Sequence, residues 1–418
     1  MSFVSGPQSL RNHNDDQGKP LVPAQDNLPV GDDVSATAPF PAKSALRAGR
    51  FYHPEIDALR FLAFLAVLVH HAFPPDASTY VGFGFSAGVA AWITAVVRSG
   101  GFGVDLFLGL SAYLITELLI REHEKRGSID IRAFYIRRAL RIWPLYFVFL
   151  AIVILVLPHL LRHEQLSPIE SVGYLTFLGN WTCTVFGYPA SVAAPLWSVS
   201  IEEQFYLMWP FLLAVIGIRR VRGLALSLLA IATITRVVLV MQGVGHPGIW
   251  CNTFARLDAI AGGALLAVLL RGGAPALKSG ARLLMALAGV LLFVLAARYG
   301  SFDGAASLYT YPAAAAASLL VLLSVLRPMG SRQPIMASRP LLYLGKISYG
   351  LYVFHLLALA VAAHLIGTTI APLLLGVRFC LALVIAIAIA AVSYRWLEEP
   401  FLRLKSRFTY VNSRPVRQ

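Results

Sequence analysis

The chain has 418 residues, of which 57% are hydrophobic and 13% are charged. A soluble domain usually has about 25% charged residues, so this composition excludes an ordinary soluble protein and indicates a membrane protein. The net charge of +14 would suit a nucleic-acid partner, but the placement of the basic residues excludes one, as shown below. The cysteines Cys183, Cys251 and Cys380 have no metal-ligand spacing, and no metal site is predicted.

Residues 1–54 are polar and rich in Pro, Asp, Ser and Gly, with no apolar run. Such a segment cannot bury a core, so it is predicted to be a disordered tail. It lacks the basic start and apolar core of a signal peptide, and the first membrane helix is expected to serve as an uncleaved anchor. A transmembrane domain is predicted for residues 55–402 and a basic tail for residues 403–418.

Long apolar runs predict an all-α, polytopic membrane protein with about ten transmembrane helices, since about 20 residues cross a bilayer. The helices are expected at 57–73, 102–120, 141–161, 196–217, 223–241, 254–271, 281–298, 307–327, 341–366 and 371–397. The shorter segments 80–97 and 170–186 are expected to be interfacial or re-entrant pieces of outer loops. Pro400 is expected to end the last helix.

Basic residues occupy every second loop and the C-terminal tail, whereas the alternate loops carry little more than Arg98, Arg162 and Arg298. This asymmetry predicts that both termini are cytoplasmic. The positive charge is then explained by membrane topology, which removes the argument for nucleic acid.

The first helix carries Asp57, Arg60, His70 and His71 within an apolar run. Arg60 and His71 are eleven positions apart, which places them within about 20° of one helix face and about 16 Å apart along the axis. Asp57 shares that face, whereas His70 points about 80° away from Arg60. Titratable groups inside a bilayer are costly, so a functional role is expected for this stripe.

Asp105 lies near the start of the second helix, in the run from Gly103 to Tyr113. The acid either favours the helix N-terminus electrostatically or pairs with an arginine or a substrate, and the residues leave both interpretations open. The small residues in this run permit close helix packing.

Arg137, Arg138 and Arg141 form a cluster with three- and four-residue spacing before the third helix. Membrane topology alone accounts for basic residues here. Arginine also binds phosphate bidentately, so a cytoplasmic nucleotide-bearing donor such as an acyl-coenzyme A would fit.

Ser198, Glu202 and Tyr206 repeat every four residues and therefore share one helix face, while Glu203 is turned by about 100°. Two acids facing lipid would be costly, so they are expected to face the protein interior or the water boundary. They are either satisfied by arginines, or one of them orients an imidazole.

Two further candidates have plain structural interpretations. Arg256 could form an ion pair with Asp258 near the start of the sixth helix, and His355 could be a hydrogen-bonded histidine of the ninth.

Five motifs in order resemble the bacterial membrane acyltransferase-3 family over roughly residues 51–405. They are the arginine and histidine pair Arg60 and His71, the run Gly103–Ala112, the arginines at 137, 138 and 141, the run Trp197–Tyr206 and the run Ser348–His355. The chain departs from the family at Leu108-Gly109, and at Ala112 where the family usually has glycine, so helix packing could differ there.

The resemblance implies an integral inner-membrane O-acyltransferase that moves an acyl group, expected to be acetyl, from cytoplasmic acyl-CoA to a hydroxyl of a surface or exported polysaccharide. No permanently bound cofactor is expected. His71 would be the general base or carry the acyl group, Arg60 would position the donor or stabilise the thioester oxygen, and Glu202 would hold the imidazole or the acceptor. The predicted substrate-binding residues are Arg137, Arg138, Arg141, Asp105, Trp197, Ser198, Glu203, Tyr206, Arg256, Tyr349 and His355.

A transporter or channel is the alternative from another class, because buried Arg, His and Glu residues also line ion paths. No inverted repeat or pair of broken helices supports it. A third interpretation keeps the chemistry but changes the acceptor to a lipid, an oligosaccharide or a small secreted metabolite.

Overall fold

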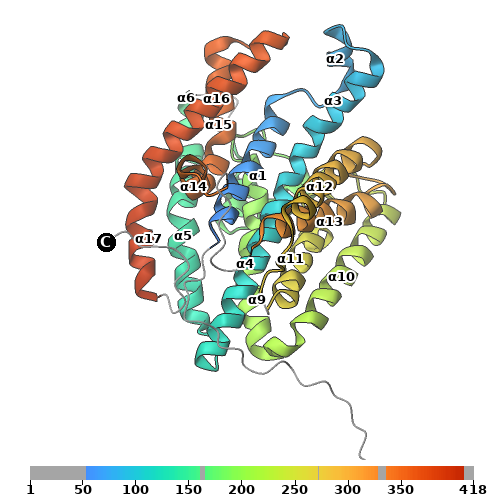
Figure 1. The fold of residues 1–418 in the computed structure, drawn as a ribbon. Coiled ribbons are helices and arrows are strands. Elements are labelled where there is room, and N and C mark those ends of the chain that lie inside the picture. The colour runs from blue at the N-terminus through green and yellow to red at the C-terminus, as the bar shows by residue number, and fades with distance from the viewer. Residues whose placement is uncertain (1–52, 161–164, 272, 328–335, 409–418) are drawn as a thin grey trace, which may run out of the picture. The chain divides into compact units, whose positions relative to one another are not determined.

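The computed structural model describes residues 53–160, 165–271, 273–327 and 336–408, all of which form helices, turns and loops (Figure 1). The predicted tail at residues 1–54 lies almost wholly outside the described residues, as does the end of the predicted tail at 403–418. Long helices stand side by side, and the described part of the chain contains no strand.

The helices follow one another along the chain with short connections. They are α1 Pro54–Ala72, α2 Ala77–Gly82, α3 Ala87–Ser99, α4 Gly103–Arg126, α5 Ile131–Ala151, α6 Leu157–Leu160, α7 Pro168–Leu175, α8 Gly179–Phe186, α9 Trp197–Ile216, α10 Val221–Met241, α11 Leu257–Leu269, α12 Ser279–Tyr299, α13 Ser307–Val325, α14 Arg339–Lys346, α15 Ser348–Ile366, α16 Pro372–Ser393 and α17 Glu399–Lys405.

The prediction of an all-α, multi-pass membrane protein is confirmed, and each of the ten expected segments is helical. Eight helical stretches among the described residues are long and apolar enough to cross a membrane. Helices α1 and α11 are outside those eight. Helix α1 carries Glu55, Asp57 and Arg60 within its 19 residues, and α11 has only 13 residues.

The connections differ from expectation at two places. Helix α3 runs through the 3₁₀ turn Gly100–Phe102 directly into α4, so the segment expected at 80–97 extends a membrane helix. The segment expected as one helix at 341–366 is instead divided at Ile347 into α14 and α15.

The expectation that Pro400 ends the last helix is wrong. The helix passes through a π-helical turn, Tyr394–Glu398, and continues as α17 to Lys405. Pro400 is the second residue of α17, and a π-helical turn changes the hydrogen-bond register just before the position where proline lacks an N–H.

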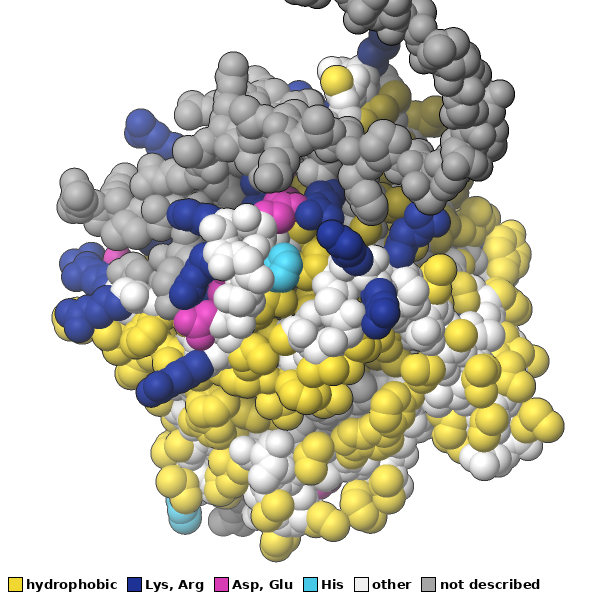
Figure 2. All heavy atoms as spheres, turned by 90° about the horizontal axis from the view of Figure 1, so that it is seen from below, with side chains coloured by type: hydrophobic (Ala, Val, Ile, Leu, Met, Phe, Trp, Pro, Cys, Tyr) yellow, Lys and Arg dark blue, Asp and Glu magenta, His cyan; other side chains and the backbone are white. Residues whose placement is uncertain are grey.

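Basic side chains gather on one end of the bundle. The loops after α4, α9 and α11 and the end of α17 all lie at the lower end in Figure 1, and Figure 2 shows Lys and Arg side chains on this face. We call it the basic face. The pattern of alternating loop charge read from the sequence therefore corresponds to one physical face.

Helices α4 and α11 approach closely because each has a glycine at the crossing. A Cβ added to Gly263 would lie 2.0 Å from the carbonyl oxygen of Gly109, and one added to Gly109 would lie 3.2 Å from that of Ala259. Small residues let membrane helices pack backbone to backbone, which compensates for the absence of a hydrophobic driving force in lipid.

Two buried ion pairs add to this packing. Arg256 donates to Asp105 at 3.0 Å, which ties the start of α11 to α4. Arg236 of α10 donates to both carboxylate oxygens of Asp258 in α11. The predicted Arg256–Asp258 pairing is therefore replaced by two pairs whose partners are distant in sequence.

Replacing Gly263 with alanine should destabilise the protein. The added Cβ overlaps the Gly109 backbone, and overpacking typically costs about 1–3 kcal/mol. The apparent melting temperature of detergent-purified protein, followed by fluorescence, measures the effect. Gly376→Ala is the matched control, since a Cβ there meets nothing within 4 Å. Equal melting temperatures for both variants would contradict the close packing.

Replacing Asp105 with asparagine should also lower the melting temperature, because it leaves the Arg256 cation buried without its carboxylate. Breaking a buried pair typically costs about 3–5 kcal/mol. The double variant Asp105→Asn with Arg256→Gln removes both charges and should recover part of the loss. If the loss in the double variant equals the sum of the losses in Asp105→Asn and Arg256→Gln measured singly, the pair is not coupled as described.

Candidate active site

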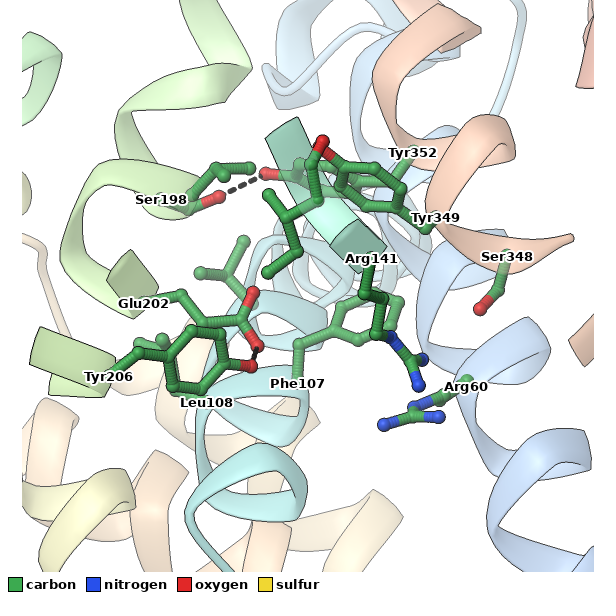
Figure 3. A pocket seen from close by; sticks show the side chains of 13 residues that line it. Arg60, Phe107, Leu108, Arg141, Ser198, Glu202, Tyr206, Ser348, Tyr349 and Tyr352 are labelled. Atoms are coloured by element: carbon green, nitrogen blue, oxygen red, sulfur yellow. Dashed lines mark hydrogen bonds between the residues drawn. The ribbon is translucent and has the colours of Figure 1, made fainter. Parts of the chain in front are cut away.

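A pocket opens between α1, α4, α5, α9 and α15, with an empty volume of about 660 Å³ that includes space open to solvent (Figure 3). Its lining comes from five helices that are far apart in sequence. The lining residues are Arg60, Val104, Phe107, Leu108, Arg141, Ile142, Ser198, Val199, Glu202, Tyr206, Ser348, Tyr349 and Tyr352.

One side of the pocket is cationic. The guanidinium groups of Arg60 and Arg141 point toward one another in Figure 3. Arg60 also lies 3.6 Å from the carboxylate of Asp57. Two like charges that converge in a half-buried pocket favour an anionic ligand between them, because Arg forks bind phosphate and carboxylate groups bidentately.

The other side is formed by hydroxyl groups and one carboxylate. Ser111 of α4 donates to Glu202 at 2.6 Å and lies 2.5 Å from the Tyr206 hydroxyl, which also donates to Glu202. Ser198 and Tyr352 share a hydrogen bond of 2.6 Å. The bonds from Ser111 and Tyr206 hold the Glu202 carboxylate across the pocket from the two arginines (Figure 3).

The three clustered arginines have different surroundings. Arg141 lines the pocket. Arg137 is buried and donates to Glu122 at 2.8 Å and to the Phe408 carbonyl at 2.8 Å. The Arg138 guanidinium lies 5.4 Å from the centroid of each of two rings, Phe134 and Tyr206.

Three other predicted residues are divided between the pocket and its surroundings. Tyr349 lines the pocket and donates to the Ile142 carbonyl at 3.1 Å. Glu203 faces away from it and accepts a bond from Trp143 at 3.1 Å, as its angle on the helix predicts. Trp197 packs against Trp250, with ring centroids 6.0 Å apart.

The histidines gather at the other end of α1. The His71 ring lies 5.0 Å from that of His70 and 5.0 Å from that of His355. The His71 side chain is exposed, and its Nδ1 lies 2.9 Å from the Val67 carbonyl oxygen. A carbonyl only accepts, so Nδ1 carries the proton and the Nε2 lone pair of neutral His71 is available as a base.

His355 joins the histidines to the pocket. Its Nδ1 lies 2.5 Å from the carbonyl oxygen of Tyr352, whose side chain lines the pocket. Its Nε2 is buried without a hydrogen-bond partner. Of the two residues, Arg60 lines this pocket and His71 does not; His71 lies eleven residues farther along α1, about 16 Å away. Tyr352 and His355 lie between them.

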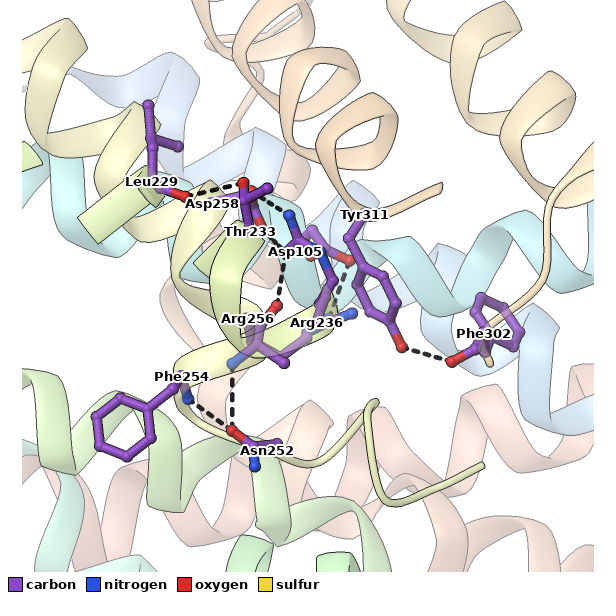
Figure 4. Close-up of polar contacts among 11 residues, drawn as sticks. Asp105, Leu229, Thr233, Arg236, Asn252, Phe254, Arg256, Asp258, Phe302 and Tyr311 are labelled. Atoms are coloured by element: carbon purple, nitrogen blue, oxygen red, sulfur yellow. Dashed lines mark hydrogen bonds and ion pairs between the residues drawn. The ribbon is translucent and has the colours of Figure 1, made fainter. Parts of the chain in front are cut away.

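Asp105 and Arg256 are placed outside the pocket lining, in the ion pair described above (Figure 4). The Arg256 guanidinium lies 3.9 Å from the centroid of the Trp250 ring and 5.1 Å from that of Tyr311. Both contacts are cation–π interactions, which satisfy a buried cation that makes few hydrogen bonds.

Sequence reasoning missed Ser111, Ser348 and Tyr352. Ser348 and Tyr352 belong to the same short motif as Tyr349 and His355, and their three- and four-residue spacing was the available signal. Ser111 had no such signal, because its partner Glu202 lies on another helix. Within the described residues, no group of three or more acidic, histidine or cysteine side chains could hold a metal.

Residues 53–395 match the family model described as "Acyltransferase domain". Peptidoglycan O-acetyltransferase OatA of Listeria monocytogenes is 26% identical over 86% of this chain and 57% of its own length. The putative peptidoglycan O-acetyltransferase YrhL of Bacillus subtilis is 26% identical over 84% of this chain and 55% of its own length. No solved structure matches.

The chain thus spans little more than half the length of these relatives. The family match covers most of the chain and confirms the resemblance that its five motifs indicate. The chain belongs to the acyltransferase domain family.

Proposed function

We propose that this protein is an integral membrane O-acyltransferase that moves an acetyl group from acetyl-CoA on the cytoplasmic side to a hydroxyl of a cell-wall or exported polysaccharide. The observation that carries the proposal is the arrangement along α1. Arg60 lines a cationic pocket near the start of α1, and His71 is exposed near the end of the same helix. The relatives named as peptidoglycan O-acetyltransferases support acetyl as the group and a glycan as the acceptor.

The donor would enter from the basic face, which we assign to the cytoplasm because cytoplasmic loops of membrane proteins carry excess Lys and Arg. Arg60 and Arg141 would bind its phosphate groups, with Arg138 near the entrance. Both termini then lie in the cytoplasm, and in a bacterium with two membranes the protein is in the inner one.

The apolar part of the lining suits the neutral arm of the donor. Phe107 and Leu108 lie on the pocket wall, and the ring centroids of Phe107 and Tyr352 are 5.8 Å apart. Three residues after Tyr352, the Nε2 atom of His355 is buried without a hydrogen-bond partner. The thioester would be directed along this line toward His71.

His71 would act as general base. Its Nε2 takes the proton from the acceptor hydroxyl while the hydroxyl oxygen attacks the thioester carbonyl carbon. The C–S bond breaks, CoA leaves as a thiolate, and the proton passes from the imidazolium to the CoA sulfur. The result is an acetyl ester and CoA thiol. In a two-step variant, His71 Nε2 first accepts the acetyl group from CoA and then passes it to the acceptor hydroxyl.

Replacing His71 with alanine should lower acetyl transfer at least about 100-fold, because general-base catalysis contributes about 10²–10⁴. Acetyl content of surface glycan in cells, and transfer from labelled acetyl-CoA by protein in liposomes, measure the loss. Added imidazole should restore part of the activity, since the site of His71 is exposed. The matched control His70→Ala should lose less, because the His70 ring bonds instead to the Val97 carbonyl. Unchanged transfer by His71→Ala would exclude this role.

Replacing Arg60 or Arg141 with glutamine should raise the KM for acetyl-CoA about 10-fold or more, since a hydrogen bond to a charged group is worth about 1.5–3 kcal/mol. Arg222→Gln, at an exposed arginine outside the pocket lining, is the control and should leave that KM unchanged. A wild-type protein that neither transfers nor hydrolyses acetyl-CoA in liposomes would favour a transporter instead.

A further inference from the structure

Four aromatic rings gather at the end of the bundle opposite the basic face. They come from separate loops: Tyr188 follows α8, His246 and Trp250 lie between α10 and α11, and Phe302 lies between α12 and α13. The centroid distances are 4.5 Å for Trp250–Phe302, 5.8 Å for His246–Phe302 and 5.7 Å for Tyr188–His246. We call these four residues the aromatic platform.

The platform has a buried base and open upper rings. Trp250 is only 5% exposed, whereas Tyr188 is 42% exposed and His246 is also exposed. Rings that merely fill a core would be closed on all sides. Trp and Tyr rings that anchor a protein at a membrane surface sit at the level of the lipid headgroups, whereas the platform has a buried ring, Trp250, at its base.

The base of the platform is held rigidly. Trp250 stacks on the Arg256 guanidinium at 3.9 Å, and Arg256 is fixed by its ion pair with Asp105. The Tyr311 hydroxyl donates to the Phe302 carbonyl at 2.9 Å (Figure 4). A surface fixed before binding loses little conformational entropy when a ligand arrives.

Charged groups border the rings. The Arg98 guanidinium lies 5.3 Å from the centroid of Phe302. Asp303 accepts a bond from Ser301 at 2.6 Å, and this bond lowers the pKa of the Asp303 carboxyl, so it is ionised at neutral pH. Beside the aromatic faces, the guanidinium can donate to, and the carboxylate can accept from, the hydroxyl and amide groups around a sugar ring.

The platform is continuous with the histidines of α1. The surrounding rings desolvate His246 and so lower its pKa; the Asp303 carboxylate raises it, and the charges of His70 and Arg98 lower it further. In space, the His70 ring bonds to the carbonyl of Val97, the residue before Arg98, whose guanidinium lies 5.3 Å from the centroid of the Phe302 ring. The His70 ring in turn lies 5.0 Å from that of His71.

We propose that the aromatic platform binds a sugar ring of the acceptor glycan, with the apolar C–H face of the ring on Tyr188 and His246 and its polar substituents toward Arg98 and Asp303. This inference rests on the proposed function, because it supplies the acceptor that His71 would deprotonate. Aromatic side chains offer a large, rigid contact area with few rotatable bonds, which suits a flat ligand.

The test uses the protein in liposomes, with peptidoglycan-derived oligosaccharides as the probe. Tyr188→Ala and Arg98→Gln should each raise the KM for the oligosaccharide about 10-fold or more, while the KM for acetyl-CoA stays the same. Phe186→Ala is the matched control, since Phe186 is 60% exposed two residues away and lies outside the platform. Its acceptor KM should remain within about twofold of wild type. Tyr188→Trp keeps a flat ring and should retain most of the binding.

Equilibrium binding of labelled oligosaccharide without acetyl-CoA separates this inference from the proposed function. Binding that Tyr188→Ala and Arg98→Gln weaken, with Phe186→Ala unaffected, supports the platform even if no acetyl is transferred. Wild-type acetyl transfer with an acceptor KM and binding that are insensitive to these substitutions would overturn the platform and leave the proposed function in place. Absence of oligosaccharide binding by the wild type would overturn it as well.

Discussion

Helix α1 imposes the central constraint on this structure, because it carries two acids, an arginine and two histidines in an otherwise apolar helix. Charged and titratable groups in such a helix are stable only where other protein groups pair with their charge or hydrogen-bond to them. Asp57 stands beside Arg60, and backbone carbonyls accept from His70 and His71. Gly100 lets the end of α3 approach α1 closely enough for the contact between Val97 and His70: a Cβ on Gly100 would lie 2.2 Å from the Ala66 carbonyl oxygen.

The same requirement organises the helices farther from α1. Arg236 and Arg256 are almost fully buried, and each finds a carboxylate on another helix. These pairs link α10, α11 and α4 in series, and the α4–α11 crossing at Gly109 and Gly263 keeps the series compact. The scaffold so formed positions one wall of the pocket and the base of the aromatic platform.

The helices and the stripe on α1 could be predicted from the sequence because both depend on local order. Apolar runs mark helices, and helical geometry fixes the angle between Arg60 and His71 whatever surrounds them. Partners across helices could not be predicted this way. Asp258 is two residues from Arg256 in sequence, yet Arg256 pairs with Asp105, 151 positions away. The choice of partner is made by tertiary packing.

Two local departures from a regular helix could not be predicted from the sequence either. Nothing in the run of residues around Ile347 distinguishes a continuous helix from the observed division into α14 and α15. A proline usually ends a helix, and the π-helical turn before Pro400 that lets this one continue has no simple sequence signature.

The layer between the pocket and the histidines has a consequence for the membrane itself. His355 is fully buried there, and the rings of Phe64 and Phe107 flank it and Tyr352. Hydrated ions and protons cross such an aromatic layer only at a large desolvation cost, whereas a short uncharged acyl chain does not meet that cost. In the proposed function, where the pocket and His71 face opposite aqueous compartments, this layer would keep ions and protons from crossing the membrane along α1.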